Sequence, residues 1–314
     1  MLRYRLITGP ILIIFLLAAV WLDERLGGPG LARPDALGAP LRTADGEPVA
    51  SGVIPAGTIL LGIGVLAMSF AATEIAAVLR ALGARASVPL LIIAAWAGVV
   101  LPWAGPLMAR PGAVSAAAAT VPVALVACTL LAATRGRRTD GATLAAAGTV
   151  FTFAYPGLAV GMLLAIRHEH SAWWIVGIVM TTKSCDIGAY FTGTSIGRRK
   201  LIPWLSPGKT WEGLAGGVLT AAAVGAGLAA LSTRLPMAGD HVPVLAGAVV
   251  GAILGGVGQL GDLAMSLLKR DAGIKDAGRV LPGMGGVMDV LDSPAMVAPL
   301  AYWLVPIAAG LGGG

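Results

Sequence analysis

Acidic and basic side chains gather between Gly261 and Pro294, in an otherwise apolar chain. Asp262, Asp289 and Asp292 offer hard oxygen ligands, and cations such as Lys269 stand close by in the sequence. Glycines before Asp289 would let the backbone approach a ligand closely. Carboxylates, flexible glycines and cations together are typical of sites where Mg²⁺ bridges a polyphosphate, because the metal takes hard oxygens and the cations neutralise the remaining phosphate charge. The pattern predicts phosphate chemistry, and a plain polar loop is the alternative.

The elements that must position these groups belong to a membrane protein. Of 314 residues, 57% are hydrophobic and 12% are charged, which a water-soluble domain of this size does not sustain. The 45 glycines suit helices that pack closely in lipid. We therefore expect an all-α fold, a polytopic transmembrane helix bundle that forms a single integral membrane domain over 1–314. The net charge of +6 does not indicate nucleic-acid binding, because the basic residues are scattered through short loops.

Apolar windows long enough to cross a bilayer predict about nine spans. Most of the basic residues fall in the loops of one side, so the positive-inside rule predicts a cytoplasmic N-terminus and an external C-terminus. We expect a multi-pass protein of the inner (cytoplasmic) membrane, with the first span retained as an anchor, residues 27–57 as an external loop and the charged cluster on the cytoplasmic side. The windows lie near 7–22, 53–74, 88–109, 114–134, 142–166, 171–193, 212–232, 243–268 and 294–311.

Charged residues inside these windows need partners. A carboxylate such as Asp262 costs on the order of 3 kcal/mol at the centre of a bilayer, so a cation should compensate it. Lys269 or Arg270, one to two turns later, could do so structurally. Lys183 and Asp186 stand three residues apart and should share a helix face. They either neutralise one another or contact a substrate.

Local patterns predict helix packing and helix starts. The G-x-G-x-x-G pattern that ends at Gly261 lies within an apolar helical run with no strand before it, so it indicates close helix packing and not dinucleotide binding. Ser206-Pro207 and Ser293-Pro294 each read as an N-cap followed by proline at the first helical position. Both are expected to start helices, whose free N–H groups favour anions.

These residues resemble the phosphatidate cytidylyltransferase (CDP-diacylglycerol synthase) family. The resemblance spans about residues 183–293 and includes the segments Asp186 to Phe191, Gly197 to Leu201 and Ser206 to Gly213. The family signature is S-x-x-K-R-x4-K-D-x-G-x-x-x-P-G-H-G-G-x-x-D-R-x-D. This chain matches it in register at Ser266, Lys269, Arg270, Lys275, Asp276, Gly278, Pro282, Gly283, Gly285, Gly286, Asp289 and Asp292.

The resemblance implies an enzyme that transfers a cytidylyl group from CTP to phosphatidate in phospholipid biosynthesis, giving CDP-diacylglycerol and pyrophosphate. It implies Mg²⁺, with room for a second cation, and it makes CTP, phosphatidate, membrane lipids and a second copy of the chain the expected partners. The implied metal ligands are Asp262 and Asp289, with Asp292 and Asp276 as secondary candidates. Implied phosphate or head-group contacts are Lys209, Lys269, Arg270 and Lys275, and the remaining substrate-site residues are Lys183, Asp186, Ser206, Gly285 and Gly286.

Departures from the family pattern leave alternatives open. Met284 replaces a histidine of the family, Val290 an arginine and Gly208 a lysine, so several phosphate contacts are absent. We expect activity to be retained because the carboxylates are all present. The alternatives are a CTP-dependent transferase for another lipid phosphate, a transporter whose intramembrane charges line an ion path, and an inactive lipid-binding paralogue.

Overall fold

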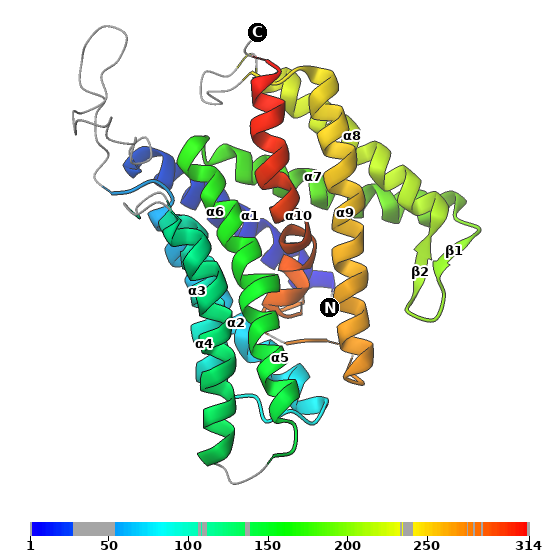
Figure 1. The fold of residues 1–314 in the computed structure, drawn as a ribbon. Coiled ribbons are helices and arrows are strands. Elements are labelled where there is room, and N and C mark those ends of the chain that lie inside the picture. The colour runs from blue at the N-terminus through cyan, green and yellow to red at the C-terminus, as the bar shows by residue number, and fades with distance from the viewer. Residues whose placement is uncertain are drawn as a thin grey trace, which may run out of the picture.

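The computed structural model describes residues 2–27, 54–105, 108, 112–135, 139–232, 234, 241–274, 276–278, 280–283 and 285–312, and its architecture is a helix bundle (Figure 1). The helices are α1 (Leu2–Leu26), α2 (Thr58–Ala81), α3 (Val88–Ala104), α4 (Ala113–Arg135), α5 (Ala142–Thr152), the π-helical turn η2 (Phe153–Leu158), α6 (Ala159–Glu169), α7 (Trp173–Ile196), α8 (Trp211–Ser232), α9 (Val244–Asp271) and α10 (Val287–Gly310). Two short strands, β1 (Lys200–Ile202) and β2 (Ser206–Thr210), form an antiparallel hairpin between α7 and α8.

The predicted all-α membrane bundle is confirmed. Each predicted window overlaps a helix, with α5, η2 and α6 forming one continuous helical segment. Within the described residues, six helices are long and apolar enough to cross a membrane: α2, α4, the α5–α6 segment, α8, α9 and α10. The helix α3 is apolar but shorter, and α7 carries Lys183 and Asp186 in its middle. Of the predicted external loop 27–57, residues 28–53 lie outside the described part of the chain.

Small residues set the spacing of the helices that carry the charged cluster. In Figure 1, α9 and α10 stand side by side and the β hairpin projects beyond α7 and α8. A Cβ added to Gly225 would overlap the carbonyl oxygen of Gly247, so α8 and α9 pack backbone to backbone. A Cβ on Gly261 would lie 2.5 Å from the carbonyl oxygen of Asp292, which brings α9 equally close to α10. The predicted packing role of Gly261 is confirmed.

Both predicted helix starts are wrong. Ser206 lies in β2 opposite Ile202, and α8 begins only at Trp211, whose N–H donates to the carbonyl oxygen of Arg199 at 3.0 Å. Ser293 lies inside α10, which begins two turns earlier at Val287. A serine–proline pair favours a helix start when only the local sequence is considered. At Ser206, pairing with β1 holds the segment in a strand, and at Ser293 the helix already begins at the cap before Val287.

A buried ion pair joins α1 to α6 at the other end of the bundle. Arg167 Nε lies 2.9 Å from Asp23 Oδ2, and both side chains are almost fully buried. Asp23 also accepts hydrogen bonds from the N–H groups of Gly57 and Ile59 at the start of α2. The N-terminal part of α1 lies near the loop before α10, because Thr8 Oγ1 donates to the carbonyl oxygen of Pro282 at 3.0 Å.

Candidate active site

Charged side chains from four elements meet where the hairpin, α7, α9 and the first turns of α10 come together. They form ion pairs that include most of the predicted catalytic and metal-binding residues. The contributing residues are Lys183 and Asp186 from α7, Lys209 from β2, Asp262 and Lys269 from α9, and Asp289 and Asp292 from α10.

The β1–β2 hairpin positions Lys209 next to Asp262. Lys209 Nζ lies 2.6 Å from Asp262 Oδ2 and donates to the carbonyl oxygen of Gln259 at 3.4 Å. Thr210 Oγ1 accepts a hydrogen bond from the N–H of Gly213 at 3.0 Å, so β2 turns directly into α8 and holds Lys209 over α9. With 38% of its side chain exposed, Asp262 is accessible to a ligand.

The alternative pairing of Asp262 with Lys269 or Arg270 is wrong. Lys269 Nζ lies 2.7 Å from Asp289 Oδ1 on α10, and Arg270 is exposed in the last turn of α9. Lys269 therefore pairs across to α10, with the carboxylate of Asp289, and not with Asp262 on its own helix. The partner of Asp262 comes instead from a strand more than fifty residues earlier in the sequence.

Lys183 bridges two carboxylates deeper in the bundle. Its Nζ lies 3.4 Å from Asp186 Oδ2 and 3.7 Å from Asp292 Oδ1. The shared helix face of Lys183 and Asp186 is confirmed. Gln259 Nε2 donates to Asp186 Oδ1 at 2.6 Å, which fixes the second oxygen of that carboxylate. Asp262 is near enough to act electrostatically on both Asp186 and Asp292, so the Lys209–Asp262 pair and the Lys183 contacts form one charged region. The Lys269–Asp289 pair is a separate contact between α9 and α10.

The first turn of α10 is capped from two directions. Asp289 Oδ2 accepts from the N–H of Gly286 at 3.0 Å. Glu74, on α2, accepts from the N–H groups of Val287 and Met288 at 2.8 and 2.9 Å, and only 4% of Glu74 is exposed. A carboxylate is favourable here because the N-terminus of a helix carries free N–H groups and a partial positive charge.

Sequence reasoning missed Glu74 and Gln259. Glu74 could have been singled out for the same reason as Asp262, because a carboxylate at the end of an apolar window needs a polar partner. The partner of Glu74 lies more than two hundred residues away in the chain, so neither motif nor spacing pointed to it.

The motif glycines make room for carboxylates. A Cβ on Gly278 or on Gly286 would overlap a carboxylate oxygen of Glu74. Gly285 has φ +96°, a conformation that favours glycine, and a Cβ there would lie 2.6 Å from Asp289 Oδ2. In this structure, Gly285 and Gly286, predicted to approach a substrate, approach the carboxylates that build the start of α10.

Three other predicted site residues take no part in these ion pairs. Ser206 is half-buried in β2, whereas Arg270 and Asp276 are exposed at and beyond the end of α9. Lys275 lies outside the described residues, as does Met284.

The donor chemistry of the site suits a hard divalent cation. Carboxylate oxygens are the side-chain ligands that Mg²⁺ prefers, and Mg²⁺ commonly takes only one or two of them and completes its shell with water and substrate phosphates. Among the described residues, no three His, Cys, Asp or Glu side chains are grouped closely enough to hold a metal by themselves. The arrangement therefore fits a cation that binds together with a phosphate ligand.

Comparison with known proteins identifies the family of this chain. Residues 48–308 match the cytidylyltransferase family. The chain is 38% identical over 155 residues to a phosphatidate cytidylyltransferase of Bacillus subtilis, which covers 49% of this chain and 55% of the relative. It is 47% identical over 128 residues to a phosphatidate cytidylyltransferase of Brucella suis, covering 41% and 45%, and 37% identical over 157 residues to the uncharacterized protein YnbB of Escherichia coli, covering 50% of each.

The chain thus spans about half the length of the curated relatives that it matches. The family match is much longer and takes in the helix that carries Glu74 as well as the ion-paired region of α7 to α10. On the strength of that match, which extends over most of its length, the chain belongs to the cytidylyltransferase family.

Proposed function

We propose that this protein transfers a cytidylyl group from CTP to phosphatidate, producing CDP-diacylglycerol and pyrophosphate. One observation supports it most strongly. Lys209 and Asp262, and likewise Lys269 and Asp289, form ion pairs of 2.6 and 2.7 Å at one end of the bundle. Such pairs can exchange partners when a polyphosphate arrives with its cation, because the phosphates take over the lysines and the cation takes over the carboxylates.

The reaction requires positioning and charge neutralisation more than proton transfer. A phosphate oxygen of phosphatidate attacks the α-phosphorus of CTP, a new P–O bond forms, and the bond to the β-phosphate oxygen breaks to release pyrophosphate. The nucleophile is already anionic, so no general base is needed. Lys209 and Lys269 would stabilise charge that develops on the phosphate oxygens, and they do so in a partly buried site where such interactions are stronger than in water.

The proposal includes Mg²⁺ held by Asp262 and Asp289, with Asp292 as a third candidate and a second cation alongside. When bound, the cation would neutralise phosphate charge and orient the α-phosphorus. Asp262 is the most accessible of the three, whereas the side chain of Asp292 is only 7% exposed and contacts Lys183. We therefore assign Asp292 mainly to holding Lys183, which also contacts Asp186.

The proposal also places the protein in the cell's inner membrane with this site on the cytoplasmic side, where CTP is made, and it includes association as a homodimer. Cysteine accessibility in intact cells would test the sidedness. Light scattering of the detergent-solubilised chain would test the dimer.

The direct test is turnover by the purified full-length chain in nanodiscs, with CTP, Mg²⁺ and phosphatidate, read out as CDP-diacylglycerol by mass spectrometry. Asp262→Asn and Asp289→Asn should each lower turnover by at least about 100-fold, or about 2.7 kcal/mol. The matched control is Asp271→Asn, an exposed carboxylate at the end of the same helix as Asp262, which should leave turnover unchanged.

Other outcomes would point to other functions. Turnover within about twofold of wild type for both site variants would remove these residues from the metal site. Product formed from a different lipid phosphate would replace phosphatidate as the acceptor. CTP binding without turnover would indicate an inactive paralogue, and ion flux through reconstituted vesicles would indicate a transporter.

A further inference from the structure

Gln259 carries the only carboxamide side chain of this protein, which has one glutamine and no asparagine among its 314 residues. It lies in α9 one turn before Asp262, and only 4% of it is exposed. A buried carboxamide within a membrane span is costly unless it is hydrogen-bonded. Gln259 Nε2 donates to Asp186 Oδ1 at 2.6 Å, and Lys209 Nζ donates to the main-chain carbonyl oxygen of Gln259 at 3.4 Å. This turn of α9 is therefore in contact with both α7 and the hairpin.

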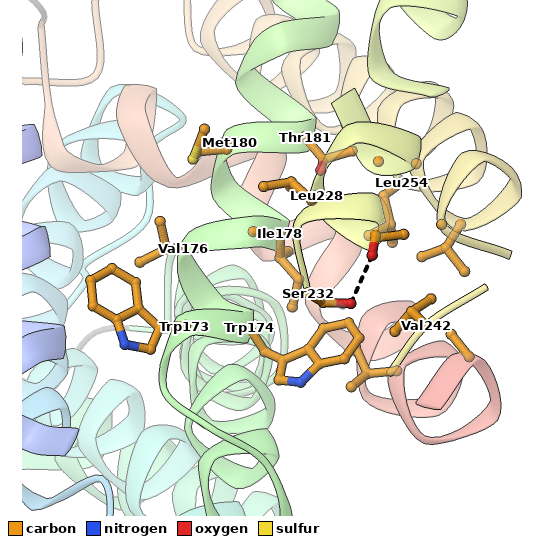
Figure 2. A pocket seen from close by; sticks show the side chains of 18 of the residues that line it. Trp173, Trp174, Val176, Ile178, Met180, Thr181, Leu228, Ser232, Val242 and Leu254 are labelled. Atoms are coloured by element: carbon orange, nitrogen blue, oxygen red, sulfur yellow. Dashed lines mark hydrogen bonds between the residues drawn. The ribbon is translucent and has the colours of Figure 1, made fainter. Parts of the chain in front are cut away.

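The hydrogen bonds of Asp186 come from the charged region and not from the apolar interior of the bundle. An apolar cavity of about 440 Å³ lies between α7, α8 and α9, and no charged side chain lines the part that the structure describes (Figure 2). On α7 its lining ends at Thr181, so neither Lys183 nor Asp186 belongs to it. Among the described residues, the donors to Asp186 are Lys183 Nζ at 3.4 Å and Gln259 Nε2 at 2.6 Å. One carboxylate oxygen thus accepts from a cation and the other from a neutral amide.

The amide holds Asp186 without neutralising it. Lys183 is shared between Asp186 and Asp292, at 3.4 and 3.7 Å, and Lys209 forms an ion pair with Asp262. These carboxylates outnumber the two ammonium groups, so the region keeps an excess of negative charge. A cation in place of the amide would remove that excess, whereas an apolar side chain would leave Asp186 Oδ1 without its donor. A neutral donor fixes the carboxylate and preserves the charge that attracts cations.

We infer that Gln259 is a positioning residue: its amide holds Asp186 in place while Lys183 exchanges its carboxylates for a phosphate group. The inference rests on the proposed function, in which a phosphate ligand takes over lysines of the site. The side chain of Asp186 is 34% exposed, so water can reach the oxygen that Lys183 leaves, but water does not fix the orientation of a carboxylate. The amide does so, because it is buried and belongs to a packed helix. Gln259 thereby keeps α7 aligned with α9 during the exchange.

Because the protein has a single carboxamide, the contact can be measured without any substitution. The full-length chain in detergent micelles is labelled with glutamine that carries ¹⁵N in its side chain, which gives one NH₂ group in the NMR spectrum. One proton of this group donates to a carboxylate, so its resonance should lie well downfield of the other. The resonance should move upfield in Asp186→Asn and stay unchanged in Asp271→Asn, the removal of an exposed carboxylate from the same helix as Gln259. A signal that ignores Asp186→Asn would overturn the inference.

Addition of CTP and Mg²⁺ tests the positioning role, with phosphatidate left out so that no transfer occurs. The downfield resonance should persist at saturating CTP, because the amide keeps Asp186 while Lys183 turns to the phosphates. Movement to the position seen in Asp186→Asn would show that the amide releases the carboxylate together with the lysine, which contradicts the inference.

Turnover tests whether the amide matters for the reaction. Gln259→Leu removes the donor at similar volume, so turnover should fall about tenfold or more at every pH, the loss expected for a hydrogen bond to a charged group. In Gln259→Glu the new carboxyl group donates to Asp186 when protonated and repels it when ionised. Its turnover relative to wild type should therefore fall about tenfold or more as the pH rises. A role in packing alone would add no such pH dependence, and a profile parallel to that of wild type would refute the inference.

The measurements separate this inference from the proposed function. Wild-type turnover in both Gln259→Leu and Gln259→Glu would remove the role of Gln259 and leave the reaction in place. No product from the wild-type chain, with the Asp186-dependent signal present, would remove the reaction and leave the amide contact in place.

Discussion

Glu74 should control the start of α10 although it lies on α2, outside every motif in the chain. Its carboxylate accepts the N–H groups of Val287 and Met288 at 2.8 and 2.9 Å and is buried. A hydrogen bond to a charged group contributes about 1.5–3 kcal/mol. Glu74→Ala should therefore destabilise the first turn of α10 by about 3–6 kcal/mol, because it leaves both buried N–H groups without an acceptor.

Hydrogen exchange measures this loss locally. Since 1.4 kcal/mol corresponds to a factor of ten, the amides of Val287 and Met288 should exchange about 100-fold faster or more in Glu74→Ala. Glu74→Gln should fall between Ala and wild type, because the amide keeps one acceptor oxygen and places a donor against the second N–H. Turnover should fall in the same order, since Asp289 lies in the turn that Glu74 caps.

The control is Glu169→Gln, which removes a carboxylate from an exposed position at the end of α6 and should leave the exchange of α10 unchanged. Exchange of the Val287 and Met288 amides within threefold of wild type in Glu74→Ala would refute the reasoning. Wild-type turnover in that variant would show instead that the start of α10 does not position the site.

Three further perturbations test the remaining parts of the structure. Gly286→Ala places a Cβ within 2.5 Å of a Glu74 carboxylate oxygen, so turnover and thermal stability should both fall, whereas Gly62→Ala on α2, with open space around its Cβ, should change neither. Asp23→Asn removes the fully buried carboxylate that pairs with Arg167 and leaves only the partly exposed Glu24, at 3.4 Å, as its charge partner, so it should cost about 3 kcal/mol, seen as a lower thermal midpoint in nanodiscs. Chelation of divalent cations should abolish turnover, and Mg²⁺ should restore it far better than Ca²⁺, which prefers more ligands at longer distances.

The class of the protein and the kind of chemistry to look for can be recognised in the amino-acid sequence alone. Apolar windows report helices that cross lipid because the signal is local: about twenty neighbouring residues are enough to recognise a span. Charges inside or beside such windows stand out for the same reason, which is why hydropathy and residue type were sufficient to single out Asp262, Asp289 and Lys183. The spacing of glycines and carboxylates after Ser266 resembles the signature of the phosphatidate cytidylyltransferase family.

Which charges meet depends on how the helices pack in three dimensions. Hydropathy and spacing say nothing of how a helix is rotated or which helix lies beside it, so the partner of Asp262 proved to be Lys209 of a hairpin and not its neighbour Lys269. The hairpin replaced a predicted helix start because backbone pairing with β1 took up the N–H and C=O groups of that segment. Glu74 caps α10 across more than two hundred residues for the same physical reason: buried polar groups must find partners, and close packing of distant segments determines which partners are within reach.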